Sequence, residues 1–158
     1  MDDFEKYLNK AFYFLKVRPR SEKELRDKLK LKKAPQDIIE RIVSSFKEQK
    51  FLNDEEFAKW WIEQRLRFRP KAFRIIELEL KAKGISKEIL EELRTKNQEL
   101  RPETDLESAK KIVEKKLPRY KGLDRQEIYK KLGAHLARQG FSWDTIKKVI
   151  DEGLAKRV

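Results

Sequence analysis

The stretch LKAKGISKEIL, residues 80–90, decides the fold. An apolar helix end runs into a glycine, which suits the left-handed residue that closes a helix, and a serine then suits the cap of a new helix. A second copy, LARQGFSWDTIK, spans residues 136–147, and a fainter copy, LKLKKAPQDII, spans residues 29–39. The leucines that open the three copies are 51 and 56 residues apart. Such a repeat predicts an array of small helical units rather than one globular catalytic domain.

Apolar residues at helical spacing place nine helices in this array. We expect them at about residues 3–17, 22–32, 35–50, 54–69, 72–83, 87–97, 105–117, 125–139 and 143–156. The predicted fold is all-α, with three tandem three-helix repeats that form an elongated, curved array. The predicted repeats span residues 1–52, 53–97 and 105–158, and residues 98–104 form a linker.

Four capping boxes mark helix starts, because a short polar side chain is followed three residues later by a glutamate. They pair Ser21 with Glu24, Asn53 with Glu56, Thr104 with Glu107, and Asp124 with Glu127.

The composition favours an anionic partner. Charged residues make up 43% of the 158, apolar residues 39%, and the formal net charge is +12. A cationic surface near phosphates releases condensed counterions, so nucleic acid is the expected partner. The chain has no cysteine, no apolar run long enough to span a bilayer and no secretory signal at its start, which predicts a cytoplasmic protein without a membrane segment.

Catalysis is not expected, and no cofactor or metal is predicted. The single histidine, His135, lies beside Leu132 and Leu136 on a helix, where packing explains it better than acid–base chemistry. The acids Asp54, Glu55 and Glu56 occupy a first helical turn, where the helix dipole favours negative charge.

A helix-turn-helix that reads duplex DNA is a further interpretation of residues 80–93. Its second helix would present Glu88, Glu91 and Glu92 to the phosphates, which disfavours sequence-specific duplex binding.

Candidate binding residues follow from charge and helical phase. Trp60 points away from the face that Ala58 and Ile62 share, so it is predicted either to stack on a base or partner or to pack against a neighbouring repeat. Rows of cations on the expected helices supply the other candidates, which are Arg65, Arg67, Lys71, Arg74, Lys81, Lys110, Lys111, Lys115 and Arg138.

The ordered motifs resemble the RecX family of bacterial regulators. The segment RPRSEKEL, residues 18–25, is similar to the R-x-R-S-x-x-E-L pattern that opens the family. FLNDEEFA at residues 51–58 resembles its hydrophobic-Leu-Asp-Asp-x-x-Phe-Ala segment, and Ile75 to Ile85 and the Gly140–Phe141–Ser142 turn resemble its later ones. Asn53 stands for the usual aspartate, Lys50 for a frequent glycine, and residues 71–73 lack the usual Lys-Gly-Pro.

The resemblance implies a non-enzymatic modulator of RecA recombinase. It implies a monomer of three tandem repeats that lodges in the groove of the RecA filament on single-stranded DNA and inhibits recombinase, ATPase and co-protease activities. Duplex DNA would bind more weakly. A standalone basic helical regulator that binds nucleic acid without a recombinase is the alternative.

Overall fold

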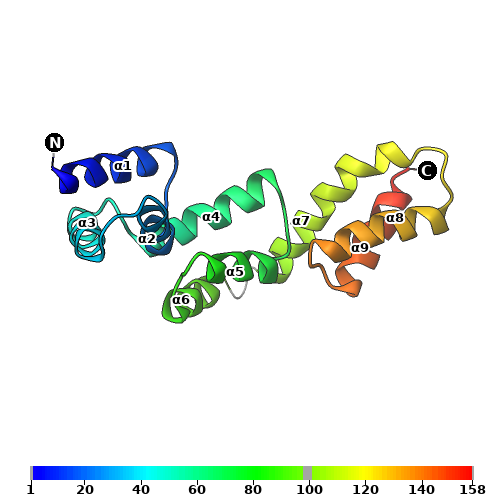
Figure 1. The fold of residues 1–158 in the computed structure, drawn as a ribbon. Helices are drawn as coiled ribbons and strands as arrows, with labels where there is room; N and C mark the ends of the chain where they lie inside the picture. Colours follow the sequence, from blue (N-terminus) through cyan, green and yellow to red (C-terminus); the bar gives the residue numbers. More distant parts are fainter. Residues whose placement is uncertain (1, 98–100, 158) are drawn as a thin grey trace. The chain divides into compact units, whose positions relative to one another are not determined.

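The described part of the chain, residues 2–97 and 101–157 of a computed structural model, consists of helices joined by turns and loops (Figure 1). Its elements are α1 (Asp3–Val17), α2 (Glu22–Leu31), α3 (Gln36–Glu48), α4 (Asp54–Phe68), α5 (Phe73–Ala82), α6 (Lys87–Asn97), α7 (Arg101–Lys116), the 3-10 helix η1 (Leu117–Tyr120), α8 (Arg125–Arg138) and α9 (Trp143–Ala155). These two ranges contain no strand. The predicted all-α fold of three-helix repeats is therefore confirmed.

The start of α7 differs from the sequence expectation. This helix begins at Arg101, so Thr104 lies inside it and the predicted capping box at that residue is wrong. Pro102 is compatible with this start, because the missing N–H of a proline in the first turn has no partner within a helix anyway. Of the predicted linker, residues 98–100 lie outside the described residues and residues 101–104 form the first turn of α7.

The other predicted caps form hydrogen bonds. At Ser21 the capping box is complete, with the Glu24 N–H donating to the serine hydroxyl and the Ser21 N–H donating to the Glu24 carboxylate, each over 3.1 Å. The side chains of Asn53 and Asp124 each accept a backbone N–H from three residues ahead. These side chains fix where α2, α4 and α8 begin.

The three turns that predicted the repeats share one backbone geometry. The second residue after each helix, namely Lys33, Gly84 or Gly140, has a positive φ of 67°, 82° or 92°. The next residue donates its N–H back to the opening leucine, as in Ala34 to Leu29, over 3.0 to 3.2 Å. All three leucines are fully buried. The fainter copy is thus the same turn with a lysine where the others have glycine.

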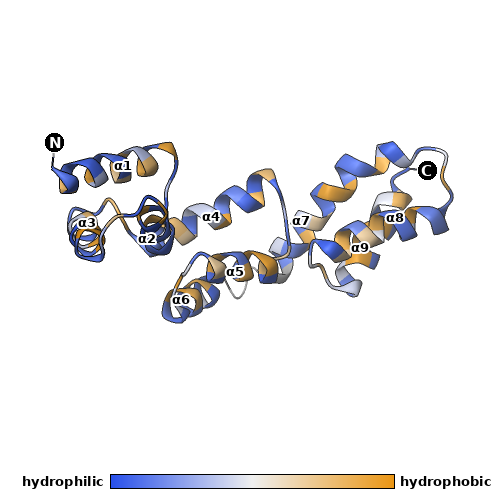
Figure 2. Cartoon of the chain, in the orientation of Figure 1, coloured by the Kyte–Doolittle hydropathy of each residue, from blue (hydrophilic) through white to orange (hydrophobic). Residues whose placement is uncertain are grey.

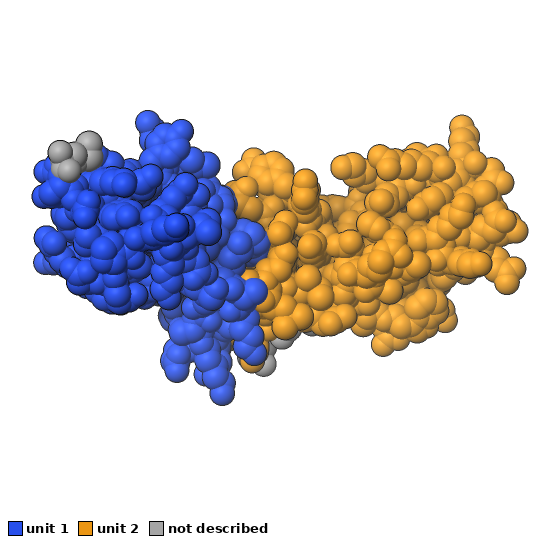
Figure 3. Space-filling view, viewed as in Figure 1, with its two compact units in different colours: residues 1–61, 80–92 blue, residues 62–79, 93–158 orange. Residues whose placement is uncertain are grey.

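Contacts divide the chain into two compact units (Figure 3). Unit 1 comprises Met1–Trp61 with Leu80–Glu92, and unit 2 comprises Ile62–Glu79 with Leu93–Val158. The apolar faces of the helices turn toward neighbouring helices within each unit (Figure 2). Unit 1 packs Leu25 and Phe46 in its core, and unit 2 packs Leu132 and Ile150. None of the helices in the described ranges is both long and apolar enough to cross a bilayer.

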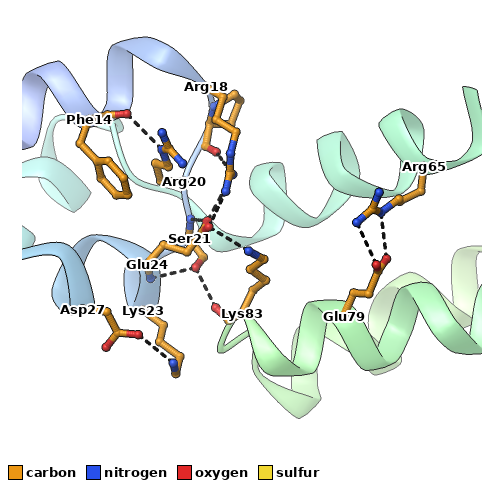
Figure 4. A network of polar contacts seen from close by, with 11 residues as sticks. Phe14, Arg18, Arg20, Ser21, Lys23, Glu24, Asp27, Arg65, Glu79 and Lys83 are labelled. Atoms are coloured by element: carbon orange, nitrogen blue, oxygen red, sulfur yellow. Dashed lines mark hydrogen bonds and ion pairs between the residues drawn. The ribbon is translucent and has the colours of Figure 1, made fainter. Parts of the chain in front are cut away.

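Within unit 1, a polar joint links the first repeat to the turn after α5 (Figure 4). The buried Ser21 hydroxyl donates to the Lys83 carbonyl over 2.7 Å, and Lys83 Nζ reaches the Glu24 carboxylate over 3.1 Å. Arg18 also binds Glu24, over 2.5 Å, and the N–H of Glu22 donates to Asp54 Oδ1 over 2.8 Å. We call this set of contacts the first joint.

Within unit 2, an equivalent second joint links the start of α5 to the turn after α8. The Ala72 N–H donates to the Gln139 carbonyl over 3.0 Å, and Arg74 Nε donates to the Gly140 carbonyl over 2.8 Å. The Phe73 N–H donates to Asp105 Oδ1 over 2.9 Å. Each joint therefore docks the start of one repeat's second helix against the turn of the next repeat.

Candidate nucleic-acid interface

A cationic hollow of about 410 Å³ lies in unit 2, between the α4–α5 connection, α7 and α8. Helical phase places Lys115 and Lys116 at the end of α7, while the break between Phe68 and Phe73 brings Arg69 and Pro70 toward them. The residues that line it are Arg65, Phe68, Arg69, Pro70, Lys71, Ile112, Lys115, Lys116, His135 and Gln139. Five cations thus converge with no carboxylate in the lining.

A second hollow, of about 620 Å³, continues along α8. It shares Lys116 and His135 with the first, and Tyr120, Glu127, Lys130, Lys131, Ala134 and Arg138 complete its lining. Five Lys and Arg residues line one hollow and four line the other, with Lys116 common to both, against the single carboxylate of Glu127. We call the two hollows together the basic groove. Such an excess of cations attracts phosphates.

Two cations of the groove are held by one carboxylate. Arg65 binds Glu79 over 2.9 Å, as Figure 4 shows, and Lys71 approaches the same carboxylate at 3.4 Å. All three side chains are mostly shielded from water. One Glu79 cannot neutralise two cations, so this end of the groove keeps a net positive charge while its side chains stay positioned.

The pKa of the histidine at the centre of the groove reflects this net positive charge. Partial burial lowers the pKa of His135 below its ordinary value, and the nearby charges of Lys116 and Arg138 lower it further. A second positive charge is unfavourable there, so the imidazole stays neutral near neutral pH. The ring of His135 is half-buried, as the sequence predicted, and it also lines both hollows.

The structure brings four of the ten sequence candidates into the basic groove: Arg65, Lys71, Lys115 and Arg138. Arg67, Lys110 and Lys111 are exposed on α4 and α7 but line neither hollow. Arg74 takes part in the second joint through its bond to Gly140. Lys81 is exposed and belongs to unit 1.

Trp60 lies in unit 1 and is half-buried. Its ring contacts those of Phe57 and Trp61 with centroids 6.2 and 6.3 Å away, and the Arg18 guanidinium lies 5.9 Å from its centroid. Packing within unit 1 therefore accounts for much of this side chain. The remaining edge borders a hollow of about 270 Å³ that Pro19, Arg20 and other residues line.

Four Lys and Arg residues and the histidine of the groove were missing from the sequence candidates: Arg69, Lys116, Lys130, Lys131 and His135. Arg69 and Lys116 belong to basic rows that the sequence shows, but their convergence depends on how α7 and α8 pack. On α8, the sequence showed Lys130 and Lys131 as a pair of adjacent cations. Among the described residues, no three His, Asp or Glu side chains gather as a metal site would require.

Fold and groove together define an all-α protein of tandem three-helix repeats with a cationic surface. Family models for RecX match all three repeats: the first three-helix domain at residues 8–45, the second at residues 53–93 and the third at residues 103–150. The chain belongs to the RecX family.

Curated relatives extend this assignment. The "Regulatory protein RecX" of Prosthecochloris aestuarii is 33% identical over 150 residues, which cover 95% of each chain. That of Bacillus subtilis is 32% identical over 151 residues, or 96% of this chain and 56% of the Bacillus protein. This chain thus spans about half the length of the Bacillus relatives that it matches.

Solved structures share the fold. The crystal structure of RecX from Lactobacillus salivarius is 28% identical and aligns with a TM-score of 0.69 over 96% of both chains. A crystal structure described as regulatory protein RecX is 25% identical, with a TM-score of 0.74 over 95% of this chain and 72% of the other. The curated relatives carry the name of a regulatory protein.

Proposed function

We propose that the chain is a non-enzymatic regulator that binds a RecA-type recombinase filament on single-stranded DNA. Binding would inhibit the recombinase, ATPase and co-protease activities of the filament. Membership in a regulatory family supports the role, and the +12 net charge supports a polyanionic partner. The regulator would act as a monomer in the cytoplasm, where such filaments form.

The observation that carries the proposal is the basic groove of unit 2. Among the described residues, six of its cations have no ion-pair partner, so they remain available to phosphates; they are Arg69, Lys115, Lys116, Lys130, Lys131 and Arg138. A filament on DNA offers phosphates together with protein surface. Charge complementarity of this kind favours both fast association and selection of the partner.

The deciding experiment measures the DNA-dependent ATPase of the recombinase at protein amounts too low to coat the DNA. Inhibition under these conditions requires contact with the filament. The double variant Lys115→Gln/Lys131→Gln should inhibit less, whereas Lys147→Gln/Lys148→Gln removes the same charge from exposed positions of α9 outside the groove and should inhibit normally. No inhibition below DNA saturation would refute the filament as the target.

The alternative function is a standalone nucleic-acid-binding regulator, which the same groove favours because phosphates alone would satisfy it. In that case inhibition appears only when the protein saturates naked DNA. The logarithmic salt dependence of DNA affinity should then become shallower by about 1 to 2 in Lys115→Gln/Lys131→Gln, since each phosphate contact contributes somewhat less than one unit.

The single histidine offers a direct readout of groove occupancy. Bound phosphates would offset the charges of Lys116, Arg138, Lys115 and Arg69 around the ring, so the pKa of His135 should rise when DNA binds. NMR titration of the imidazole with and without an oligonucleotide measures this change. An unchanged pKa at saturating DNA would exclude the groove as the DNA site.

A further inference from the structure

A second cationic groove lies on unit 1, and none of the sequence candidates belongs to it. Its volume is about 560 Å³, within the range of small-ligand pockets. It runs between α1 and α2 and is lined by Asn9, Lys10, Tyr13, Phe14, Val17, Arg20, Lys28 and Lys32. We call it the α1–α2 groove. Four of these eight residues are cations and none is an acid.

The cations of this groove have no carboxylate within ion-pair distance among the described residues. Lys10, Arg20, Lys28 and Lys32 form no ion pair among the described residues, whereas other cations of the same repeat do. Those paired cations are Arg18, Lys23, Arg26 and Lys47. The groove therefore concentrates positive charge that lacks an internal partner and is complementary to an anion.

Two of the cations are fixed by an aromatic ring. The Arg20 guanidinium lies 3.9 Å from the centroid of Phe14 and Nε donates to the Phe14 carbonyl over 3.1 Å, a bond visible in Figure 4. Lys28 Nζ lies 5.4 Å from the same centroid. Cation–π contacts hold both side chains in place before any ligand arrives, which lowers the entropy cost of binding.

The floor between the cations is apolar and exposed. Tyr13 is 73% exposed and Val17 68% exposed, so neither contributes much to the core. An exposed ring among unpaired cations suits a ligand that has both a flat aromatic face and a negative backbone. An unpaired nucleotide has both, whereas a run of Asp and Glu residues lacks the aromatic face and a duplex hides its base faces in the stack.

We propose that the α1–α2 groove binds a segment of single-stranded nucleic acid, with a base stacked on Tyr13 and phosphates at Lys10, Lys28 and Lys32. The inference rests on the proposed function insofar as DNA is a partner, but it requires no recombinase. It assigns to unit 1 a nucleic-acid site that is separate from the basic groove.

The test measures binding of the full chain to a labelled oligothymidine by fluorescence anisotropy. Tyr13→Ala should weaken binding about tenfold, as expected for the loss of one stacked base, while Tyr13→Phe keeps the ring and should bind as the parent does. Trp143→Ala removes an aromatic side chain that is 61% exposed in unit 2 and should leave the affinity unchanged. Binding to a duplex should not respond to Tyr13→Ala.

The charges are tested with a matched pair of variants. Lys10→Gln/Lys32→Gln should weaken oligothymidine binding and reduce its salt dependence, more than Lys30→Gln/Lys87→Gln, which removes two exposed charges of unit 1 outside the groove. Thermal unfolding checks that each variant is folded. Equal weakening by the two double variants would show that net charge, not this groove, binds the strand.

Photocrosslinking locates the contact. An oligonucleotide carrying 5-iododeoxyuridine should form its adduct in unit 1 with the peptide that contains Tyr13. Adducts confined to unit 2 would overturn the inference. So would oligoglutamate that displaces the oligothymidine equally well from the parent and from Tyr13→Ala. A Tyr13 adduct without ATPase inhibition would instead refute the filament proposal and leave the groove standing.

Discussion

The two joints share backbone positions but differ in chemistry. Ser21 of the first joint corresponds to Ala72 of the second, 51 residues later, and the bond from Glu22 to Asp54 recurs as the bond from Phe73 to Asp105. In the first joint a buried hydroxyl and a carboxylate bound to two cations make the contact.

The second joint places apolar groups at the same positions. Glu24 corresponds to Ile75, whose side chain lies against Gly140. The comparison teaches that the repeat preserves where the helix start docks on the turn, while Glu24 with its two cations is replaced by the apolar Ile75 beside the bonds of Arg74 and Asp105. The first joint should therefore respond to pH and to loss of hydrogen bonds, and the second to changes in volume.

The largest effect is expected at the glycine of the second joint. A Cβ on Gly140 would lie 2.3 Å from Ile75 Cγ1 and 3.3 Å from Ala72 Cβ, and φ is already 92°. Strain and overpacking together should make Gly140→Ala cost about 3 kcal/mol of the free energy of unfolding. Chemical denaturation measures it. Gly133→Ala is the control, because its Cβ meets only one atom within 4 Å, at 3.9 Å, and a helical alanine should stabilise by about 0.5–1 kcal/mol.

The next effect is expected at the hydroxyl of the first joint. Ser21→Ala removes both the cap of α2 and the bond to the Lys83 carbonyl, and should cost about 2 kcal/mol. Ser142→Ala removes an exposed cap that belongs to neither joint as defined above, so about 1 kcal/mol is expected there. Equal losses in the two variants would mean that the Ser21–Lys83 bond adds nothing.

The pH dependence should distinguish the joints. Burial opposes ionisation of Glu24, but hydrogen bonds from Arg18, the Ser21 N–H and Lys83 prevail and lower its pKa below 4.5. Its stabilisation is complete above pH 4.5 and is lost as the pH falls through the lower folded-state pKa. Amide hydrogen exchange should therefore show the first joint opening on acidification before the second, where Ile75 takes the place of Glu24.

Asp54 acts in the opposite direction. Burial raises its pKa above 3.8, so its ionised form costs stability and protonation on acidification relieves that cost. Glu24→Gln should flatten the acid-induced opening of the first joint and leave the second unchanged. If the first joint still opened before the second on acidification of this variant, Glu24 would not be the titrating group.

The smallest effect concerns the third copy of the turn. Lys33 has a φ of 67°, where the other two turns have glycine. Lys33→Gly should stabilise the protein by about 0.5–1 kcal/mol, because relief of the left-handed strain exceeds the extra entropy of an unfolded glycine. Thermal unfolding compares it with Lys32→Gly, which lies one residue earlier at negative φ and should destabilise.

Local signals account for most of what could be predicted. The leucines at positions 29, 80 and 136 and the caps at Ser21 and Asp124 follow from helical period and capping chemistry, which act over a few residues. The early start of α7 was missed because Pro102 reads equally well as a breaker and as a first-turn residue.

The binding surfaces depended on tertiary packing. Lys116 and His135 are neighbours only because α7 packs beside α8, and Arg20 joins Lys28 through the ring of Phe14. Rows of cations along the expected helices identified Lys115 and Arg138 as candidates. Helical phase alone could not show that they share one groove with residues of α4.

The distribution of tryptophans gives each unit its own optical reporter. Trp60 and Trp61 lie at the first joint with the Arg18 guanidinium within 6 Å of each ring centroid, whereas Trp143 is exposed in unit 2. Emission from the shielded pair should lie at shorter wavelength than emission from the solvated indole. Emission spectra of variants that keep tryptophan in only one unit therefore follow each half of the molecule separately, without any attached dye.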